Sequence, residues 1–206
     1  MNDKIRPMKI ALTGAIACGK SKILQLFETC GADIISLDEI SREVVMPKTQ
    51  GLQALVKQFG ANITNQDDSL NRAALRTILL KSQKNKLIIE AILHPEILEK
   101  MQAAIKTCKN KLVVVEIALL AEKNLAHLFD RAIIVQCGEQ KQLERLKKRD
   151  NFDKTTAKQL INVQISQKQH LEIGKQIPID VIENNSEVLE LTQKVQDLYQ
   201  KLNAIA

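Results

Sequence analysis

The segment Gly14-Ala15-Ile16-Ala17-Cys18-Gly19-Lys20-Ser21 matches the spacing G-x-x-x-x-G-K-[ST] at every fixed position. In such a turn, successive backbone N–H groups and the positive end of the following helix form a concave site for a chain of phosphates. Lys20 can reach the β- and γ-phosphates, and the Ser21 hydroxyl can bind Mg2+. We therefore predict a phosphate-binding loop for a nucleoside triphosphate over residues 14–21, extending to Lys22.

The residues on either side predict the elements that such a loop requires. Residues 8–14 form a short apolar run typical of a buried strand, and residues 20–31 have Ile23, Leu24 and Phe27 at helical spacing. The alternative is an incidental glycine-rich turn in a fold that binds no nucleotide. That alternative is disfavoured because the strand and helix patterns agree independently with the motif.

A second possible catalytic position follows the next apolar run. Residues 32–38 predict a strand and residues 39–46 a helix ended by Pro47, so Asp38 falls at the carboxyl end of a strand, where open α/β sheets bind ligands. Its carboxylate could take a proton from an attacking hydroxyl or orient that hydroxyl. The alternative role, capping the next helix, is compatible with this one. Arg42, one turn later, could pair with Asp38 or reach the acceptor.

The rest of the chain alternates between helical and strand patterns. Residues 50–108 are helical, rich in charge and without a strand pattern. Further strands are predicted at 111–120, 131–137 and 177–184, and further helices at 139–150, 153–172 and 187–203. This order predicts an α/β fold with a mostly parallel five-stranded sheet wrapped by helices, and a helical insertion between the second and third strands.

Further charged side chains lie at positions suited to phosphates or to a metal. Arg145 and Arg149 stand four apart, so both project from one helix face and could close over transferring phosphates, although a solvated basic face is the alternative. Arg72 and Arg76 have the same spacing on the insertion and could bind acceptor phosphates, or belong to a surface helix. Glu116 could hold a Mg2+-bound water.

Composition narrows the function. Hydrophobic residues make up 45% and charged residues 26% of the 206 residues, as in ordinary globular proteins. The aromatic fraction of 2%, without Trp, leaves few rings on which bases could stack and argues against nucleic-acid binding. The net charge of +6 favours an anionic partner, although a general excess of surface lysine explains it equally well.

Cysteine usage and hydropathy suggest the compartment. The four cysteines, including Cys18 in the loop, show no metal-ligand spacing. No apolar run approaches the length of a membrane span, and the N-terminus does not resemble a signal peptide. We expect a cytoplasmic protein with reduced thiols and no membrane contact, as a monomer or weak homo-oligomer, in which Cys18 is a small residue tolerated by the loop.

The order of motifs along nearly the whole chain resembles one kinase family. No NKxD stretch is present, which disfavours a GTPase, whereas a small-molecule kinase needs an acceptor pocket and mobile cations. The segments "ALTGAIACGKS", "DEISREVV", "FGANI", "LNRAALR", "AILHPEI", "EIALLAEKN", "QLERLKKRD" and "DVIENN" occur in the order and approximate spacing of dephospho-CoA kinase, the last enzyme of coenzyme A synthesis.

The resemblance implies a reaction and an architecture. The γ-phosphoryl group of ATP would pass to the ribose 3′-hydroxyl of dephospho-CoA, with Mg2+. The fold would be a three-layer P-loop kinase fold in a single domain. Its core would cover about 1–60, 110–137 and 175–206, the substrate-binding insertion about 61–109, and the helical lid about 138–174.

The resemblance also implies roles for individual residues. Asp38 matches the family's catalytic Asp and Arg149 its lid Arg, so the implied catalytic residues are Asp38, Lys20 and Arg149. Asn185 matches a position near the ATP adenine, and together with Arg145 and the loop it would bind ATP. The implied substrate-binding residues are Asp38, Arg42, Arg72, Arg76 and His94. For His94, which precedes Pro95, a structural role in the first turn of a helix is the alternative.

The chain departs from the family pattern at four positions. The family commonly has Gly at Ala15 and Ala17, Asp at Ser36 and Pro at Ala118. Alanine fits the loop wherever φ is negative, so we expect the loop to be kept. Loss of an acid at Ser36 removes one negative charge near the metal, but the loop lysine and serine, the catalytic Asp and the lid Arg remain.

Two other functions stay open at this point. A nucleoside or nucleotide monophosphate kinase shares the loop, the helical acceptor lobe and the lid, and differs only in the acceptor. A non-catalytic ATP-binding regulator or RNA-associated protein is disfavoured by Asp38, by the lid arginines and by the scarcity of aromatic residues.

Overall fold

The computed structural model describes residues 6–150, 153–163 and 167–206. Contacts divide the chain into two compact units, one of residues 1–35 with 108–206 and one of residues 36–107, and each is described by itself. The expected division into core, insertion and lid stays a prediction. Among the described residues, no helix has the length and apolar character that crossing a membrane requires.

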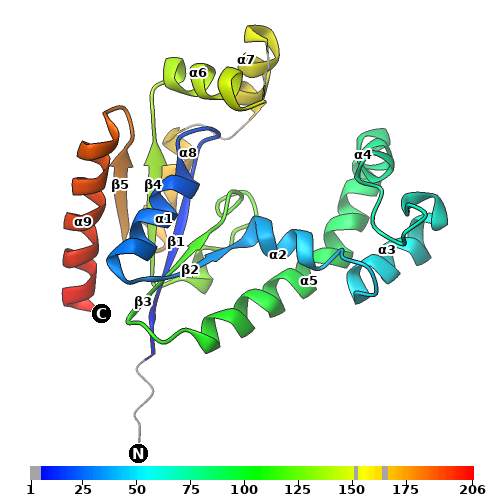
Figure 1. Ribbon diagram of the computed structural model, residues 1–206, viewed down its shortest axis with the longest axis horizontal. Helices are drawn as coiled ribbons and strands as arrows, with labels where there is room; N and C mark the ends of the chain where they lie inside the picture. Colours follow the sequence, from blue (N-terminus) through cyan, green and yellow to red (C-terminus); the bar gives the residue numbers. More distant parts are fainter. Residues whose placement is uncertain (1–5, 151–152, 164–166) are drawn as a thin grey trace, which may run out of the picture. The chain divides into compact units, whose positions relative to one another are not determined.

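The first unit is built on a five-stranded sheet with the order β2-β3-β1-β4-β5 (Figure 1). β1 pairs in parallel with β3 and with β4, and β4 pairs in parallel with β5. The predicted fold class, α/β with a parallel five-stranded sheet, is confirmed. The strands are β1 (Met8–Gly14), β2 (Asp33–Ser36), β3 (Leu112–Glu116), β4 (Arg131–Gln136) and β5 (Ile179–Glu183).

The register brings the carboxyl ends of the inner strands to one edge of the sheet. Leu12 of β1 lies opposite Glu116, the last residue of β3, and Gly14 lies opposite Val135 of β4. Because parallel strands end at the same edge, the loop after β1 and the segments after β3, β4 and β5 all begin there. This edge carries the candidate site.

Two helices cover the core of this unit. α1 (Lys20–Cys30) buries Ile23, Leu24 and Phe27, the positions with helical spacing in the sequence, and α9 (Val188–Ile205) buries a matching apolar face. The two helices contact each other and belong to one apolar cluster with β1 and β4 (Figure 1). Burial of apolar side chains from both helices holds the sheet and its loops in place.

The segment after β4 is helical. α6 (Glu139–Asp150) follows β4 directly and contacts α7 (Lys154–Val163) (Figure 1). The predicted helix 153–172 corresponds to α7 and α8 (Gln167–Leu171), after which η3 (Glu172–Lys175) leads toward β5. A further short 3-10 helix, η2 (Ala126–Leu128), precedes β4.

The second unit is helical, as predicted for residues 50–108. Its longest helix contacts the other three α-helices of the unit. An isolated antiparallel bridge joins Thr64 to Leu70, outside any strand. The elements are α2 (Leu37–Glu43), α3 (Gln50–Phe59), η1 (Ala61–Ile63), α4 (Arg72–Lys81) and α5 (Gln83–Thr107).

Two local predictions in this unit are wrong. The Ser36 hydroxyl accepts a bond from the Glu39 N–H (3.4 Å) and caps α2, so Asp38 lies in the first helical turn and neither ends a strand nor caps the helix. Pro95 lies inside α5, so His94 is not in a first turn. Contacts of α5 with three other helices outweigh the local cost of a proline in the helix.

A charged cluster ties β5 to β4 and to the C-terminal helix. The Asp180 carboxylate, 11% exposed, accepts hydrogen bonds from the Arg131 guanidinium and from the Lys201 ammonium (2.9 Å). Burial raises the pKa of Asp180, but the hydrogen bonds and charges of Arg131 and Lys201 outweigh this, so its pKa lies below the ordinary value. The ionised carboxylate therefore stabilises the folded chain.

We expect Asp180→Asn to lower the free energy of unfolding at pH 7 by about 2–3 kcal/mol, because Arg131 loses its partner. A depressed folded pKa contributes stability above the unfolded pKa, and this contribution is lost as pH falls through the folded pKa. The gap between wild type and variant should therefore shrink below about pH 4. Urea unfolding of both proteins between pH 3 and pH 8 measures this difference in the free energy of unfolding. Asp197→Asn, an exposed site on α9, is the control and should change stability by less than about 0.5 kcal/mol.

Candidate nucleotide-binding site

The phosphate-binding loop joins the end of β1 to the start of α1. Gly14 and Gly19 have φ values of 139° and 91°, which side chains rarely adopt. A Cβ atom on Gly14 would lie 2.1 Å from the Val135 carbonyl oxygen, and one on Gly19 would lie 2.4 Å from Nδ2 of Asn184. Both glycines of the motif are therefore required by the backbone conformation and by close neighbours.

The Lys20 side chain folds back over the loop. Its ammonium donates to the carbonyl oxygens of Gly14 (3.0 Å) and Ala15 (3.1 Å). The charge is thus held at the loop, at the start of α1, where the helix dipole also favours an anion. The predicted role of Lys20 toward phosphate oxygens stays a prediction.

Ser21 meets an acidic side chain from the neighbouring strand. Its hydroxyl donates to Oε1 of Glu116 at 3.1 Å. A hydroxyl and a carboxylate are hard oxygen ligands of the kind Mg2+ prefers, and Mg2+ is commonly held by one or two carboxylates together with substrate phosphates. The described part of the chain contains no cluster of three or more His, Cys, Asp or Glu suited to a metal.

The outer side of the loop is held by three side chains from distant elements. The Ile16 carbonyl accepts from Nε2 of Gln142 (2.9 Å), the Ala17 carbonyl from the Arg145 guanidinium (3.2 Å), and the Cys18 carbonyl from Nδ2 of Asn184 (2.8 Å). Arg145 was predicted to bind ATP, and here its guanidinium also donates to the carbonyl of Asn184 (3.2 Å).

Sequence reasoning missed Gln142 and Asn184. Gln142 stands three residues before Arg145 and therefore shares a helix face with it, which is the signal that could have indicated Gln142. Asn184 directly precedes Asn185, the residue matched to the adenine position. The Asn185 side chain accepts from the Gly138 N–H (2.7 Å), which fixes the chain just before α6.

The expectation of reduced thiols is wrong for the loop cysteine. Cys18 forms a disulfide with Cys137, 119 residues later and directly after the last residue of β4. Both residues are buried, so Cys18 has a structural role and is no activated thiolate. Burial raises the pKa of the Cys30 thiol, and burial with the nearby Asp33 charge raises the pKa of Cys108 to about 11, so both thiols stay protonated at neutral pH.

The remaining predicted residues of the first unit lie on helices. Lys22 is exposed in the first turn of α1. Arg149 belongs to α6, but its side chain lies outside the described residues. The predicted functions of Lys22, Arg149 and Asn185 stay predictions.

The predicted acceptor residues belong to the second unit. Asp38 and Arg42 are exposed on α2, and no ion pair joins them within the part of the chain that the structure describes. Arg72 and Arg76 are exposed on one face of α4, and His94 is half-buried on α5. Each unit is described by itself, so the expectation that these residues lie near the loop stays a prediction.

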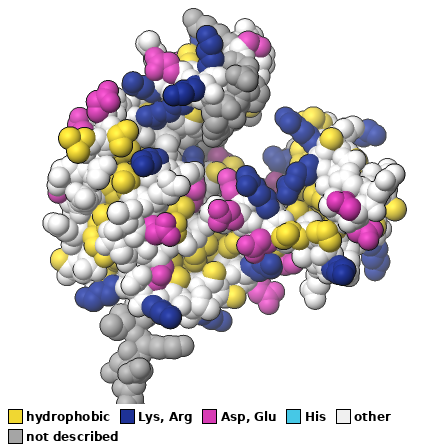
Figure 2. All heavy atoms as spheres, in the orientation of Figure 1, with side chains coloured by type: hydrophobic (Ala, Val, Ile, Leu, Met, Phe, Trp, Pro, Cys, Tyr) yellow, Lys and Arg dark blue, Asp and Glu magenta, His cyan; other side chains and the backbone are white. Residues whose placement is uncertain are grey.

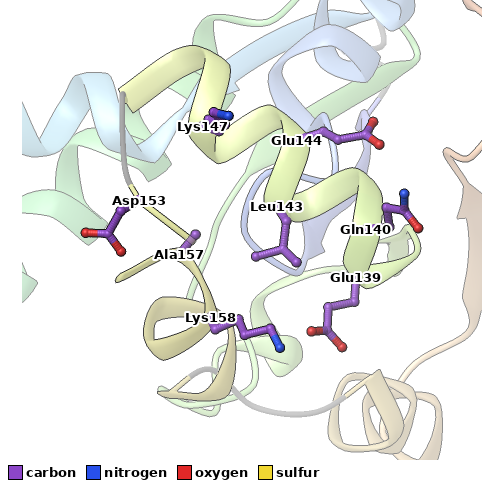
Figure 3. A pocket seen from close by; sticks show the side chains of 8 residues that line it. All are labelled: Glu139, Gln140, Leu143, Glu144, Lys147, Asp153, Ala157 and Lys158. Carbon is purple, nitrogen blue, oxygen red and sulfur yellow. The ribbon is translucent and has the colours of Figure 1, made fainter. Parts of the chain in front are cut away.

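A cavity of about 880 Å³ lies between α6 and α7 and contains no residue of the loop. Figure 3 shows Leu143 between the two helices and charged side chains around it. The cavity is lined by Glu139, Gln140, Leu143, Glu144, Lys147, Asp153, Ala157 and Lys158.

On the visible face in Figure 2, Lys and Arg side chains are interspersed with Asp and Glu side chains. The net charge of +6 therefore forms no continuous basic stripe on that face.

A parallel α/β sheet, a G-x-x-x-x-G-K-S loop between β1 and α1, and a helical segment inserted between β2 and β3 define a P-loop kinase. The fold is similar to that of TT1252 from Thermus thermophilus (TM-score 0.81, 21% identity, 98% of this chain and 99% of that chain). It is also similar to dephospho-CoA kinase from Campylobacter jejuni (TM-score 0.67, 25% identity, 95% and 97% covered).

The sequence comparisons specify the family. The dephospho-CoA kinase family model matches residues 8–190. Dephospho-CoA kinase from Vibrio parahaemolyticus is 36% identical over 197 residues, 95% of each chain, and that from Vibrio cholerae is 35% identical over 198 residues, 96% of each. The chain belongs to the dephospho-CoA kinase family, as the resemblance of its motifs predicted.

One departure within the loop carries a conformational cost. Ala17 has a φ of 58°, so the expectation that the loop alanines need only negative φ values is wrong at this position, whereas Ala15 is not in the left-handed region. A side chain in that region costs roughly 1–2 kcal/mol relative to glycine.

We expect Ala17→Gly to raise the free energy of unfolding by about 0.5–1 kcal/mol, because relief of the left-handed strain exceeds the extra entropy of the unfolded chain. Ala15→Gly is the matched control and should lower stability by a similar amount, since no strain is relieved there. Chemical denaturation of both variants compares the two. Equal destabilisation by both would contradict the strained conformation of Ala17.

Proposed function

We propose that the chain transfers the γ-phosphoryl group of ATP to the ribose 3′-hydroxyl of dephospho-CoA, giving ADP and coenzyme A. The observation that carries this proposal is the loop at the carboxyl edge of the sheet, with Lys20 over its carbonyls and Ser21 paired to Glu116, in a chain of the dephospho-CoA kinase family. We further propose that it acts in the cytoplasm as a monomer or weak homo-oligomer.

The first unit would hold the donor nucleotide. Backbone N–H groups of the loop would bind the β- and γ-phosphates, and Lys20 would exchange its carbonyl acceptors for phosphate oxygens. Ser21 and Glu116 would hold Mg2+. A bound Mg2+ would neutralise part of the phosphate charge. Arg149 of α6 would add positive charge over the transferring group, as the family resemblance implies.

The second unit would hold the acceptor. Asp38 is exposed in the first turn of α2, where its carboxylate is accessible to a substrate hydroxyl. It would accept the 3′-hydroxyl proton or align that oxygen with the γ-phosphorus. Arg72 and Arg76 project from one face of α4 and could each bind a phosphate group of dephospho-CoA with two N–H donors, with Arg42 and His94 completing the acceptor site.

The acceptor is tested by a coupled assay of ADP release with purified protein. Dephospho-CoA should support Mg2+-dependent turnover, whereas AMP, CMP, dTMP and nucleosides should give at least about a hundredfold lower kcat/KM, since their shape leaves acceptor-binding groups unpaired. Lys20→Ala should abolish turnover with every acceptor. Faster turnover of a nucleotide or nucleoside would replace the proposal by a nucleoside or nucleotide monophosphate kinase.

We expect Asp38→Asn to lower kcat by about 10²- to 10⁴-fold while KM for ATP stays unchanged, because the amide cannot accept the hydroxyl proton. Glu39→Gln is the matched control, being the next exposed acid on α2, and should keep kcat within about twofold. Steady-state kinetics at saturating ATP compare the two. Undiminished kcat in Asp38→Asn would remove Asp38 as the catalytic base.

A further inference from the structure

Every carbonyl oxygen from Gly14 to Cys18 accepts a hydrogen bond from a side chain. The Lys20 ammonium donates to the carbonyls of Gly14 and Ala15, and three residues from later elements donate to the other three. Those three bonds span 126, 128 and 166 residues of sequence, so they are tertiary contacts and not part of the local turn. The donors to Ile16, Ala17 and Cys18 are Gln142, Arg145 and Asn184, respectively.

These bonds control the atoms that would meet phosphate. In a planar trans peptide, the carbonyl of one residue and the N–H of the next point in opposite directions. Fixing the carbonyls of Ile16, Ala17 and Cys18 therefore fixes the orientation of the N–H groups of residues 17, 18 and 19. Of these, the Cys18 N–H makes a long hydrogen bond to the Ala15 carbonyl (3.4 Å), which a phosphate oxygen would have to replace. N–H groups of successive residues in such a turn form the concave anion site of a phosphate-binding loop.

Two of these donors are buried, so the loss of their hydrogen bonds would be costly. Gln142 is 5% exposed and Asn184 is 4% exposed, and a buried amide without a partner is costly. Removing either donor leaves a loop carbonyl unsatisfied, and that peptide group can then regain a partner by turning. Gln142 and Arg145 share one face of α6, whose start is held by the bond from Gly138 to Asn185.

We propose that Gln142 and Asn184 are positioning residues for the phosphates of the donor nucleotide. They do not touch the nucleotide, but hold the peptide groups that do, so the loop has its binding conformation before ATP arrives. The proposal rests on the proposed ATP site. It predicts that these two amides govern affinity for the phosphate chain and leave affinity for the acceptor unchanged.

The test is Gln142→Met, which keeps the length of the side chain and removes the N–H donor. Displacement of a fluorescent ATP analogue gives the Kd of ATP and of adenosine, and steady-state assays give the two KM values. We expect a rise of about 5- to 20-fold in the Kd and KM of ATP, with the Kd of adenosine and the KM of dephospho-CoA within twofold of wild type.

Gln140→Met is the matched control, an exposed glutamine on the same helix, and should leave all four constants unchanged. An unchanged Kd of ATP in Gln142→Met, or equal weakening of ATP and adenosine, would overturn the proposal. If Gln142→Met does not fold, Asn184→Leu removes the other buried amide donor at similar volume without adding charge. The same rise is expected in the Kd of ATP, with the Kd of adenosine unchanged. The nucleotide Kd values test this proposal even if dephospho-CoA proves not to be the acceptor.

Discussion

The phosphate-binding loop must turn its carbonyl oxygens away from the anion, and the architecture of the first unit depends on that constraint. A carbonyl turned away from the ligand needs a donor elsewhere, because an unsatisfied buried acceptor is costly. The parallel sheet supplies donors because β1, β4 and β5 end at one edge, where α6 and Asn184 follow directly. Loop conformation is therefore a property of the fold as well as of the G-x-x-x-x-G-K-S sequence.

The loop segment that contains Ala17 and Cys18 also has a disulfide and a residue in the left-handed region of the backbone. The disulfide joins Cys18 in the loop to Cys137. Cys137 directly precedes Gly138, whose N–H donates to the Asn185 side chain just before α6 begins. Ala17 is held in the left-handed region where glycine would be free of strain. Hydrogen bonds to the carbonyls on both sides of that residue offset the strain, since they would be lost if the peptide relaxed.

The features that sequence predicts here are those set by local patterns. Continuous apolar runs indicated the buried strands, and the motif indicated the loop, because both depend on neighbouring residues. Gln142, Asn184 and the cysteine pair depend on contacts across more than 100 residues. The helical spacing of Gln142 and Arg145 indicates a shared face, but no local pattern identifies the loop carbonyl that Gln142 contacts or the partner of Cys18. The start of α2 was misplaced because Ser36, where the family commonly has Asp, caps the helix two residues before Asp38.

The separation of candidate donor and acceptor residues onto two units has a structural basis in how the chain leaves and re-enters the sheet. The second unit begins at Ser36, the last residue of β2, and ends before β3, and these two strands are neighbours in the sheet. The Asp33 carboxylate at the start of β2 accepts hydrogen bonds from the backbone N–H groups of Lys109 and Asn110 (both 2.8 Å), so the two connections are joined within the first unit. The side chains that donate to the loop carbonyls, Lys20, Gln142, Arg145 and Asn184, also belong to the first unit, so these contacts do not depend on the inserted helices.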